Sequence, residues 1–406
     1  MLEGKKILLF IGGSIACYKS LYLIRALVKE GAKVRCIASP SALKFITPLS
    51  IETLSRTTLL MDGNENWAVD EGLEVAPNHI AYAKWAELAL FAPATANSIN
   101  KLAAGLADNT YLASALCLHD IPKILAPSAN TRMLENPATK ASLRLLSQRG
   151  YTVLPASHGW LACGELGNGA MARGEDLIFL AKKALYSRSF WREKRVLVTG
   201  GGSSEDVDSI RCLSNHSSGL MACNLALALY FLGARVCFIS SKFPLDLPSD
   251  MEKVEVRSTA DYLEALQGRL DSNEEKIYVF MASALSDYAP VKREGKLKKR
   301  DLGDKLSLEL HQTIDVLAAL EDKNLVKIAF KAECDEARAR DEALKVLDSK
   351  NCQLVCLNVI SDENPVFGQH ENSLVLLSRD SAPKEVQGSK LATSLEICHH
   401  VEALGL

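Results

Sequence analysis

Short apolar runs rich in Val, Ile, Leu and Phe alternate with amphipathic stretches from the first residues onward. Residues 5–12, 32–39, 88–94 and 122–129 are apolar runs of strand length, and residues 15–31 carry apolar positions at helical spacing. Buried parallel strands give near-continuous apolar runs, and the helices between them cover the sheet. The alternation therefore predicts a parallel α/β sheet with helices on its faces.

The rhythm is interrupted at residues 181–194, where the sequence turns charged and aromatic. A new strand, a glycine-rich turn and a helix follow directly. A chain of 406 residues also exceeds the usual size of a single core. We therefore predict two domains, residues 1–188 and 189–406, each a three-layer α/β/α domain of the Rossmann-like kind. The later strands of the second domain are expected within residues 235–241, 276–284, 325–333 and 352–359.

Residues 292–310 follow neither pattern, because they are basic, punctuated by glycine, and end in strand-like alternation. We predict an excursion of the chain away from the second sheet. The alternative interpretation is a solvated hairpin whose charges have no special part.

Composition narrows the classes of partner. The chain carries 47 Lys and Arg against 49 Asp and Glu, a net charge of −2, which offers no electrostatic reason to expect nucleic acid or a membrane surface. The first apolar run is too short for a signal peptide or a membrane span. The 11 cysteines include no CxxC pair, so most are expected to be buried thiols. We predict a cytoplasmic protein that acts on small molecules.

Two strand ends in the first half carry residues that can bind a phosphate group or another polar ligand. Gly12, Gly13 and Ser14 close the first strand and open a helix, an arrangement in which backbone N–H groups can hold a phosphate. The spacing lacks GxGxxG, which favours a mononucleotide over a dinucleotide, and a plain turn remains an alternative. Thr95 and Asn97 follow another strand, where they can cap the next helix or bind a ligand.

Several segments of the first half together resemble the flavin-mononucleotide-containing cysteine decarboxylases, in particular the phosphopantothenoylcysteine decarboxylase family. They are IGGSIACYKS, residues 78–109, APSANTRM and GWLACGELGNGAMAR, and the match covers nearly all of residues 1–180. The resemblance implies a flavodoxin-like fold and bound FMN, which oxidises the substrate thiol before CO2 leaves and the product is reduced. It places the flavin against Gly13, Ser14, Ser39, Thr95 and Asn97.

The same resemblance implies three catalytic residues. His79 matches an active-site histidine, and an imidazole with a pKa near ~6.5 suits proton transfer at neutral pH. Asn130 matches an asparagine that binds the substrate carboxylate, although Ala129 stands where the family usually has Met. Cys163 matches a proton-donating cysteine, and it sits in a glycine-rich segment that reads as a mobile flap. The alternative for His79 is a structural role before a helix.

The second half resembles the phosphopantothenate–cysteine ligase family over nearly the whole domain. Residues 195–233, MASALSDYAP, residues 295–310, IAFKAE, KNCQLVCLNVI and FGQHENSLVLL carry the match. It implies activation of a carboxylate by CTP as an acyl-cytidylate with Mg²⁺, then attack by the amine of cysteine. Asn215 and Lys298 are implied in the chemistry. Nucleotide contacts are implied for Met281, Ala282, Ser283, Asp287, Lys298, Thr313, Asp315, Val316, Phe330 and Lys350, and no metal ligands are identified.

Three departures from the ligase pattern leave the nucleotide preference open. SSGLMA at residues 217–222 replaces the usual SSGKMG, TIDV at residues 313–316 replaces NPDI, and Lys345 is one residue off the usual spacing from Lys350. The two matches, fused in this order, are typical of the bacterial bifunctional enzymes of coenzyme A biosynthesis.

Two other classes compete with this interpretation. A flavin-binding regulatory subunit without catalysis would share the scaffold, but the retention of His79, Asn130 and Cys163 together disfavours it. A nicotinamide-dependent oxidoreductase would explain the glycine-rich turns, yet neither turn has GxGxxG spacing. The decarboxylase family forms trimers that assemble further, so the resemblance implies a homo-oligomer with trimeric contacts.

Overall fold

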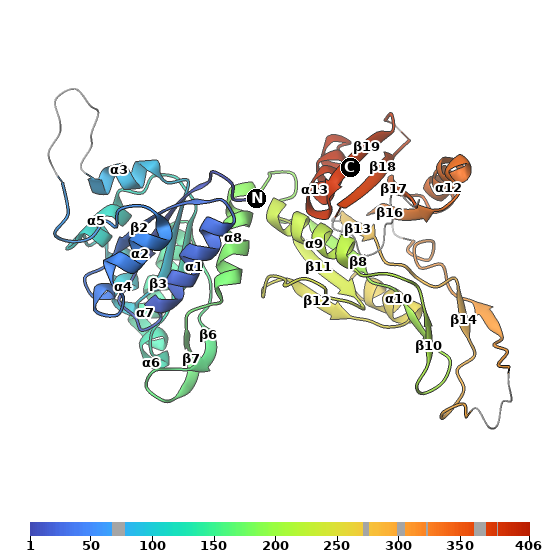
Figure 1. Cartoon of the computed structure of the whole chain (residues 1–406), viewed down its shortest axis with the longest axis horizontal. Coiled ribbons are helices and arrows are strands. Elements are labelled where there is room, and N and C mark those ends of the chain that lie inside the picture. The colour runs from blue at the N-terminus through green and yellow to red at the C-terminus, as the bar shows by residue number, and fades with distance from the viewer. Residues whose placement is uncertain (67–77, 271–275, 299–304, 322–323, 361–370, 380) are drawn as a thin grey trace. The chain divides into compact units, whose positions relative to one another are not determined.

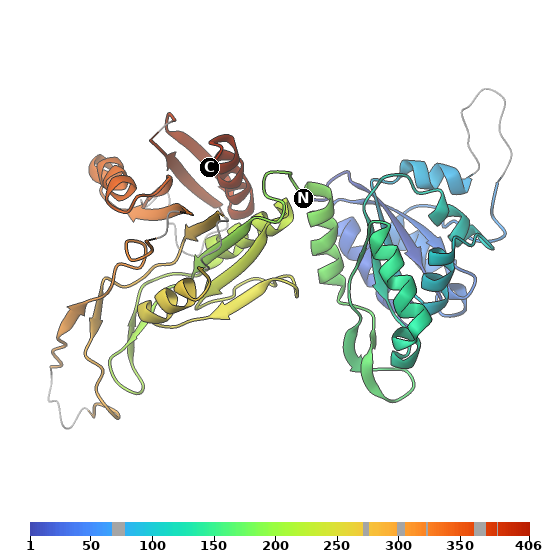
Figure 2. The ribbon, with the colours of Figure 1, turned by 180° about the vertical axis from the view of Figure 1, so that it is seen from behind.

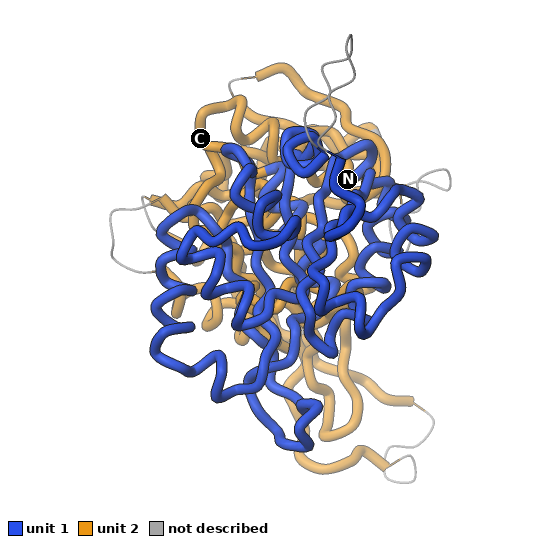
Figure 3. Tube along the Cα trace, turned by 90° about the vertical axis from the view of Figure 1, so that its left-hand side faces the viewer, with its two compact units in different colours: residues 1–186 blue, residues 187–406 orange. Residues whose placement is uncertain are grey.

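The computed structural model describes residues 1–66, 78–270, 276–298, 305–321, 324–360, 371–379 and 381–406. Contacts between residues divide the chain after Tyr186 into two compact units, residues 1–186 and residues 187–406 (Figure 3). Each unit has its own sheet and its own core, as described below.

The first unit is built on five parallel strands in the order β2-β1-β3-β4-β5. The chain runs outward from β1 to β2, returns past β1 to β3, and continues outward in the opposite direction. This is the flavodoxin-like order, and its switch point lies between β1 and β3. The strands are β1 (Lys6–Ile11), β2 (Lys33–Ala38), β3 (Leu88–Ala94), β4 (Lys123–Pro127) and β5 (Tyr151–Val153).

Helices cover both faces of this sheet, as Figures 1 and 2 show from opposite sides. Alternate β1 residues face opposite cores, so Leu9 packs with α1 and α8 while Phe10 packs with α4, α5 and α7. The helices are α1 (Cys17–Lys29), α2 (Pro48–Ser55), α3 (Asn78–Trp85), α4 (Ala96–Ala104), α5 (Thr110–Leu116), α6 (Thr131–Glu135), α7 (Pro137–Gln148) and α8 (Gly174–Tyr186), with a 3-10 turn at Ala42–Lys44.

A separate hairpin leaves the first unit after β5. Its strands β6 (Ser157–Trp160) and β7 (Leu166–Ala170) pair antiparallel, and the turn between them carries Cys163. The segment predicted to be a flap is therefore a two-stranded hairpin outside the main sheet (Figure 1).

The second unit holds an eight-stranded sheet in the order β12-β11-β8-β13-β16-β17-β18-β19. The strands from β12 to β17 are parallel, and β18 and β19 add an antiparallel edge. The order reverses between β8 and β13. The strands are β8 (Arg195–Gly200), β11 (Arg235–Ser240), β12 (Glu252–Glu255), β13 (Ile277–Met281), β16 (Leu325–Glu333), β17 (Leu354–Val359), β18 (Glu371–Leu377) and β19 (Lys384–Ser389).

One helix of this unit is apolar nearly all round, which is the pattern of a helix buried on every side. It is α9 (Leu220–Leu232), which lies between the sheet and α13 (Lys390–Ala403). On the opposite face, α10 (Thr259–Gln267) and α12 (Glu336–Ser349) pack on alternate residues of the same strands. The predicted fold class, two three-layer α/β/α domains with a flavodoxin-like first domain, is confirmed.

Two short ribbons project from the second sheet. β9 (Ser204–Asp206) pairs with β10 (Cys212–Ser214), and β14 (Tyr288–Pro290) pairs with β15 (Leu310–Gln312). The basic stretch at residues 292–310 connects β14 to β15 and so lies outside the main sheet, with residues 299–304 outside the described part.

The charged and aromatic segment between the two units contributes a buried side chain to the core of the second unit. Trp191 is fully buried and its ring lies 5.3 Å from that of Tyr278 on β13. The aromatic residues that mark the break in the sequence therefore anchor the start of the second unit.

Candidate active sites

A cavity of about 400 Å³ opens at the carboxyl ends of β1 and β3, the switch point of the first sheet. In doubly wound sheets, ligands bind outside the strand ends at this point, and flavodoxin-like proteins bind FMN there. All five residues proposed from the sequence to contact the flavin line the cavity: Gly13, Ser14, Ser39, Thr95 and Asn97.

The loops around this cavity approach so closely that two glycines are required. A Cβ on Gly12 would lie 2.6 Å from the carbonyl oxygen of Pro93, and a Cβ on Gly13 would lie 2.2 Å from the Cβ of Ser41. Gly12 N–H also donates to Pro93 O at 2.9 Å, which joins the ends of β1 and β3. Besides forming a turn, Gly12 and Gly13 thus allow the loops that surround the cavity to pack closely against one another.

The polar groups in this cavity suit an anionic mononucleotide. The Thr95 hydroxyl accepts from Ser98 N–H at 3.1 Å and caps α4, whose first turn faces the cavity. The Ser14 and Ser128 hydroxyls lie 3.2 Å apart across it. Within the described residues, no Asp or Glu lines the cavity. Helix N-terminal N–H groups and hydroxyls without a competing carboxylate fit a phosphate group.

Beside this cavity the structure joins two residues that are 33 positions apart in sequence. Asn130 Nδ2 donates to the sulfur of Cys163 at 3.3 Å, and the same thiol lies 3.8 Å from the Glu165 carboxylate. Ala129, next to Asn130, lines the flavin cavity. The sequence prediction that Asn130 and Cys163 share a site agrees with this geometry, whereas Glu165 was not among the predicted residues.

Two glycines of β7 allow the hairpin to lie directly on the segment after β4. Ala129 N–H donates to Gly169 O at 3.2 Å, and a Cβ on Gly169 would lie 2.1 Å from Ala129 O. A Cβ on Gly167 would lie 2.3 Å from the Thr131 hydroxyl oxygen. The docked hairpin therefore sets the position of Cys163 over Asn130.

His79 lies elsewhere in the first unit. It is buried on α3, a helix that contacts α5 and β1, and it is not among the residues that line the flavin cavity. The sequence places His79 with Asn130 and Cys163 on resemblance alone, so its role stays a prediction.

A second cavity, of about 490 Å³, is lined by the end of β13 and the loop after it, by residues of β16 and β17, and by the first turn of α9, the helix between β8 and β11. It lies at the second switch point, where the rule for doubly wound sheets again places a ligand. The residues proposed from the sequence that line it are Asn215, Met281, Ala282, Ser283, Asp287, Thr313, Asp315, Val316, Phe330 and Lys350.

Hydrogen bonds fix the loops around this cavity to one another. The Asn215 amide donates to Leu285 O at 2.9 Å, tying the loop after β10 to the loop after β13. Thr313 N–H donates to Asp287 O at 2.9 Å and its hydroxyl donates to Ser286 O at 2.5 Å. These bonds hold three predicted residues, Asn215, Asp287 and Thr313, in fixed positions relative to one another.

An ion pair joins two of the predicted nucleotide residues. Lys350 Nζ lies 2.8 Å from the Asp315 carboxylate. Burial acts to raise the pKa of Asp315, but the Lys350 partner and backbone N–H donors outweigh it and keep that pKa below its usual range. Lys327 supports both segments, since its ammonium donates to Leu317 O at 3.1 Å and Lys350 O at 3.4 Å.

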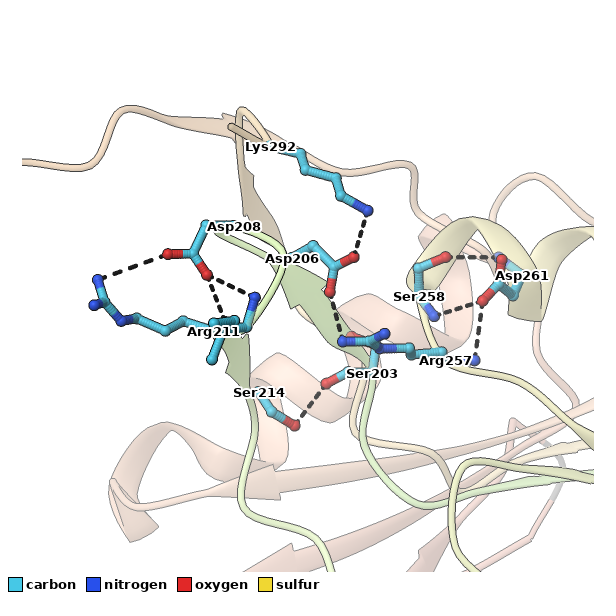
Figure 4. A network of polar contacts seen from close by, with 10 residues as sticks. Ser203, Asp206, Asp208, Arg211, Ser214, Arg257, Ser258, Asp261 and Lys292 are labelled. Atoms are coloured by element: carbon cyan, nitrogen blue, oxygen red, sulfur yellow. Dashed lines mark hydrogen bonds and ion pairs between the residues drawn. The ribbon is translucent and has the colours of Figure 1, made fainter. Parts of the chain in front are cut away.

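Lys298 does not line this cavity; it lies exposed on the segment that follows β14. Its neighbour Leu297 is anchored from both backbone groups, because Leu297 N–H donates to Asp208 at 3.1 Å and Arg211 donates to Leu297 O at 2.9 Å. Figure 4 shows Asp208 bonded to Arg211, beside Asp206 with its partners Lys292 and Arg257.

Asp208 is the buried centre of this anchor, with a side chain that is 0% exposed. Burial acts to raise its pKa, but N–H groups of Ile210, Arg211 and Leu297 donate to the carboxylate and keep the pKa below its usual value. Asp208 was not foreseen from the sequence; the only available signal was an acidic residue three positions before Arg211 in a loop.

Within the described residues, no group of three or more His, Cys, Asp or Glu side chains is arranged to hold a metal ion. Nor does that part of the chain contain a helix with the length and apolar character needed to cross a membrane.

Comparison with known families matches both units. The Flavoprotein family model matches residues 1–185, and the model of the DNA/pantothenate metabolism flavoprotein C-terminal domain matches residues 191–404. The chain is thus a two-domain flavoprotein of pantothenate metabolism.

Relatives match over the full length. The chain is 35% identical to the coenzyme A biosynthesis bifunctional protein CoaBC of Bacillus subtilis, over 100% of this chain and 98% of the relative. It is 32% identical to the CoaBC protein of Escherichia coli, over 93% of this chain and 92% of the relative. The chain belongs to the family of bifunctional coenzyme A biosynthesis proteins, which confirms the resemblance drawn from its sequence.

Solved structures similar to parts of the chain include a PPC decarboxylase mutant complexed with pantothenoylaminoethenethiol. That structure is 33% identical over 44% of this chain and 96% of its own, with a TM-score of 0.40. The C-terminal domain of a CoaBC protein is 25% identical over 53% of this chain and 98% of its own, with a TM-score of 0.41.

The hairpin contact predicts an effect of Gly169→Ala on decarboxylation. The added methyl cannot fit against Ala129 O, so the hairpin must shift and carry Cys163 away from Asn130. A displacement of about 1 Å at a reacting group can cost on the order of 10²-fold in rate. We expect a loss of this size in CO2 release from supplied phosphopantothenoylcysteine, measured at saturating flavin.

Gly159→Ala is the matched control in the same hairpin, because its Cβ would meet only the Ala170 Cβ at 3.8 Å. This variant should release CO2 at the parent rate. Equal rates for both variants would mean that the docking of the hairpin does not position the chemistry.

Proposed function

We propose that the chain ligates 4'-phosphopantothenate to cysteine with CTP in the second unit and decarboxylates the product to 4'-phosphopantetheine in the first. The observation that carries this proposal is the gathering of predicted flavin contacts in one switch-point cavity and predicted nucleotide contacts in another. Each cavity belongs to one unit, so each step has its own site and its own set of residues.

In the first site, bound FMN would supply the reversible oxidation of the substrate thiol. The Asn130 amide, which donates to Cys163 in the structure, is placed to donate instead to the carboxylate that leaves as CO2. The Cys163 thiol then lies where it can protonate the decarboxylated product during its reduction. Glu165 is placed beside that thiol to return its proton.

In the second site, a carboxylate must be activated before an amine can displace it. The pantothenate carboxylate attacks the α-phosphorus of CTP, which releases pyrophosphate and forms the acyl-cytidylate. The cysteine amine then attacks the acyl carbon and releases CMP. Charge builds on phosphate oxygens in the first step, and preorganised cations stabilise it. Lys350 lines the cavity, and the family resemblance assigns a further cation to Lys298, which lies exposed outside the cavity on the segment after β14.

Magnesium belongs to the proposal through the nucleotide. Mg²⁺ in phosphoryl-transfer sites is held by one or two carboxylates together with substrate phosphates. Asp315 is engaged by Lys350, so among the described residues that line this cavity the exposed Asp287 offers the carboxylate that is open to such an ion. The choice of CTP over other nucleotides rests on the family resemblance, and the cytoplasmic setting rests on the short first apolar run.

The competing functions fit less well. A flavin-binding subunit without catalysis has no use for an asparagine held against a cysteine thiol at 3.3 Å. A nicotinamide enzyme would need a dinucleotide site, whereas the first cavity lies at a flavodoxin-like switch point, where a mononucleotide binds.

The ligase proposal predicts that Lys298→Gln cripples ligation and spares decarboxylation. Glutamine keeps hydrogen bonding but removes the charge, and loss of one preorganised donor commonly costs on the order of 10²–10³ in rate. CTP-dependent pyrophosphate release is measured beside CO2 release from the preformed substrate. Lys296→Gln is the control, because an exposed charge on a solvated face contributes little when neutralised singly.

Asp208→Asn should produce the same selective loss, because it weakens the anchor of Leu297 beside Lys298. Equal, small losses of ligation for the Lys298 and Lys296 variants would mean that the basic run is only a solvated face.

We further propose that copies of the chain associate through α1, in line with the trimeric contacts of the family. Tyr18 and Tyr22 lie one helical turn apart on α1 and are 50% and 73% exposed, and Ile15 before them is 54% exposed. An apolar group of this kind on a surface is typical of protein–protein contacts.

Tyr22→Glu is therefore expected to reduce the molar mass measured by light scattering from that of an oligomer to that of one chain. Leu106→Glu, beyond α4 on the opposite face of the sheet, should leave the mass unchanged. An unchanged mass for the tyrosine variant would place the contact elsewhere.

A further inference from the structure

One end of the second cavity holds a lysine that none of the roles above uses. Lys390 is the first residue of α13 and lines the cavity. The preceding strand β19 pairs with β18 so that Gly388 lies opposite Asn372, which also lines the cavity. This register places Lys390 beside the end of the cavity that residues of β17 and β18 line.

Lys390 is largely covered by the protein, and it contributes to the wall of the cavity. The residue is only 3% exposed, and no hydrogen bond or ion pair joins its ammonium to another of the described residues. Burial lowers its pKa from the usual value. A buried charge is costly unless it is paired, so an ammonium with no partner among the described residues favours the binding of an anion.

The groups around Lys390 are neutral donors and acceptors. Asn358 Nδ2 donates to Asn372 Oδ1 at 3.0 Å, and Asn372 Nδ2 lies 3.6 Å from the sulfur of Met221 on α9. Asn372 thereby connects the Lys390 end of the cavity with the first turn of α9. No Asp or Glu comes from these elements into this end of the cavity, within the residues that the structure describes.

The start of α9 is a second, independent feature that favours an anion. Gly219 precedes the helix at φ 72° and has no side chain to cap it, and the Ser218 hydroxyl accepts from Leu220 N–H at 3.3 Å. The next residues of the first turn, Met221 and Ala222, line the cavity. The partial positive charge of a helix N-terminus attracts phosphate groups. The helix itself, LMACNLALALYFL, contains no basic residue, so the cation for such a site must come from another element.

We propose that Lys390 and the first turn of α9 together bind a phosphate group of a ligase substrate. The inference rests on the proposed ligase function and extends it by one binding residue that the sequence did not suggest. Two substrates of that reaction carry phosphate, the nucleotide and 4'-phosphopantothenate, and the chemistry of the site is the same for both. Lys390 is a binding residue and takes no part in making or breaking a bond.

The test is calorimetric titration of full-length Lys390→Met with CTP and Mg²⁺, and separately with 4'-phosphopantothenate. A charge-assisted hydrogen bond contributes about 1.5–3 kcal/mol, so its loss should weaken binding of one ligand by roughly 10- to 100-fold. Weakened CTP identifies a nucleotide phosphate, and weakened phosphopantothenate identifies the other source. Unchanged affinity for both overturns the inference.

Lys384→Met is the control, because this lysine lies on neighbouring β19, is exposed, and pairs with Glu396 at 2.8 Å. It should bind both ligands like the parent. If the parent chain itself binds neither ligand, the proposed ligase function fails, which is a different result from a parent that binds and a variant that binds equally well.

Thermal unfolding without ligand separates binding from packing. Removing a cation that has no partner among the described residues should leave the melting temperature of the ligand-free chain unchanged or raise it, while ligand-induced stabilisation is lost. Lys390→Gln provides a second variant with a polar end. A lower melting temperature for both variants, or their failure to fold, would mean that Lys390 supports packing, and would overturn the inference.

Discussion

Parallel strand pairing at two points of reversal, β1 with β3 and β8 with β13, is the constraint on which both sites depend. Where the strand order reverses, the loops from neighbouring strands diverge to opposite faces and leave a hollow at the strand ends. Ala284 N–H donates to Gly201 O at 2.8 Å, so the loops after β8 and β13 are joined at the edge of this hollow. The residues of the loops can therefore differ between the two units, while the strand pairing keeps a cavity at the same place in each sheet.

The strand ends also explain why glycine is needed at both sites. A Cβ on Gly200 would lie 2.6 Å from the Cβ of Ala222, so glycine lets α9 pack tightly against β8 and bring its first turn to the cavity. Gly169 has the corresponding part in the first unit, where it lets the hairpin lie on the segment after β4. In each case a glycine outside the group of reacting residues allows the close packing that positions a functional segment, the first turn of α9 in one unit and the hairpin with Cys163 in the other.

Sequence reasoning reached the fold class and the two halves because apolar periodicity and the break near Trp191 are local signals. It also singled out five residues that line the first cavity and ten that line the second, because strand ends followed by small polar residues are recognisable and the family motifs mark them. Asp208, Glu165 and Lys390 were missed for a physical reason: each acquires its part from a contact or a burial made in the folded chain. Lys390 reads in sequence as an ordinary lysine at a helix start.

The central claim is that two independent sites act in succession, and product stoichiometry tests it most directly. The full chain is supplied with phosphopantothenate, cysteine and CTP, and pyrophosphate and CO2 are measured together; in a parallel reaction it receives preformed phosphopantothenoylcysteine without nucleotide. The account predicts equal amounts of pyrophosphate and CO2 in the first reaction, and CO2 alone in the second. A requirement for CTP in the second reaction would contradict it.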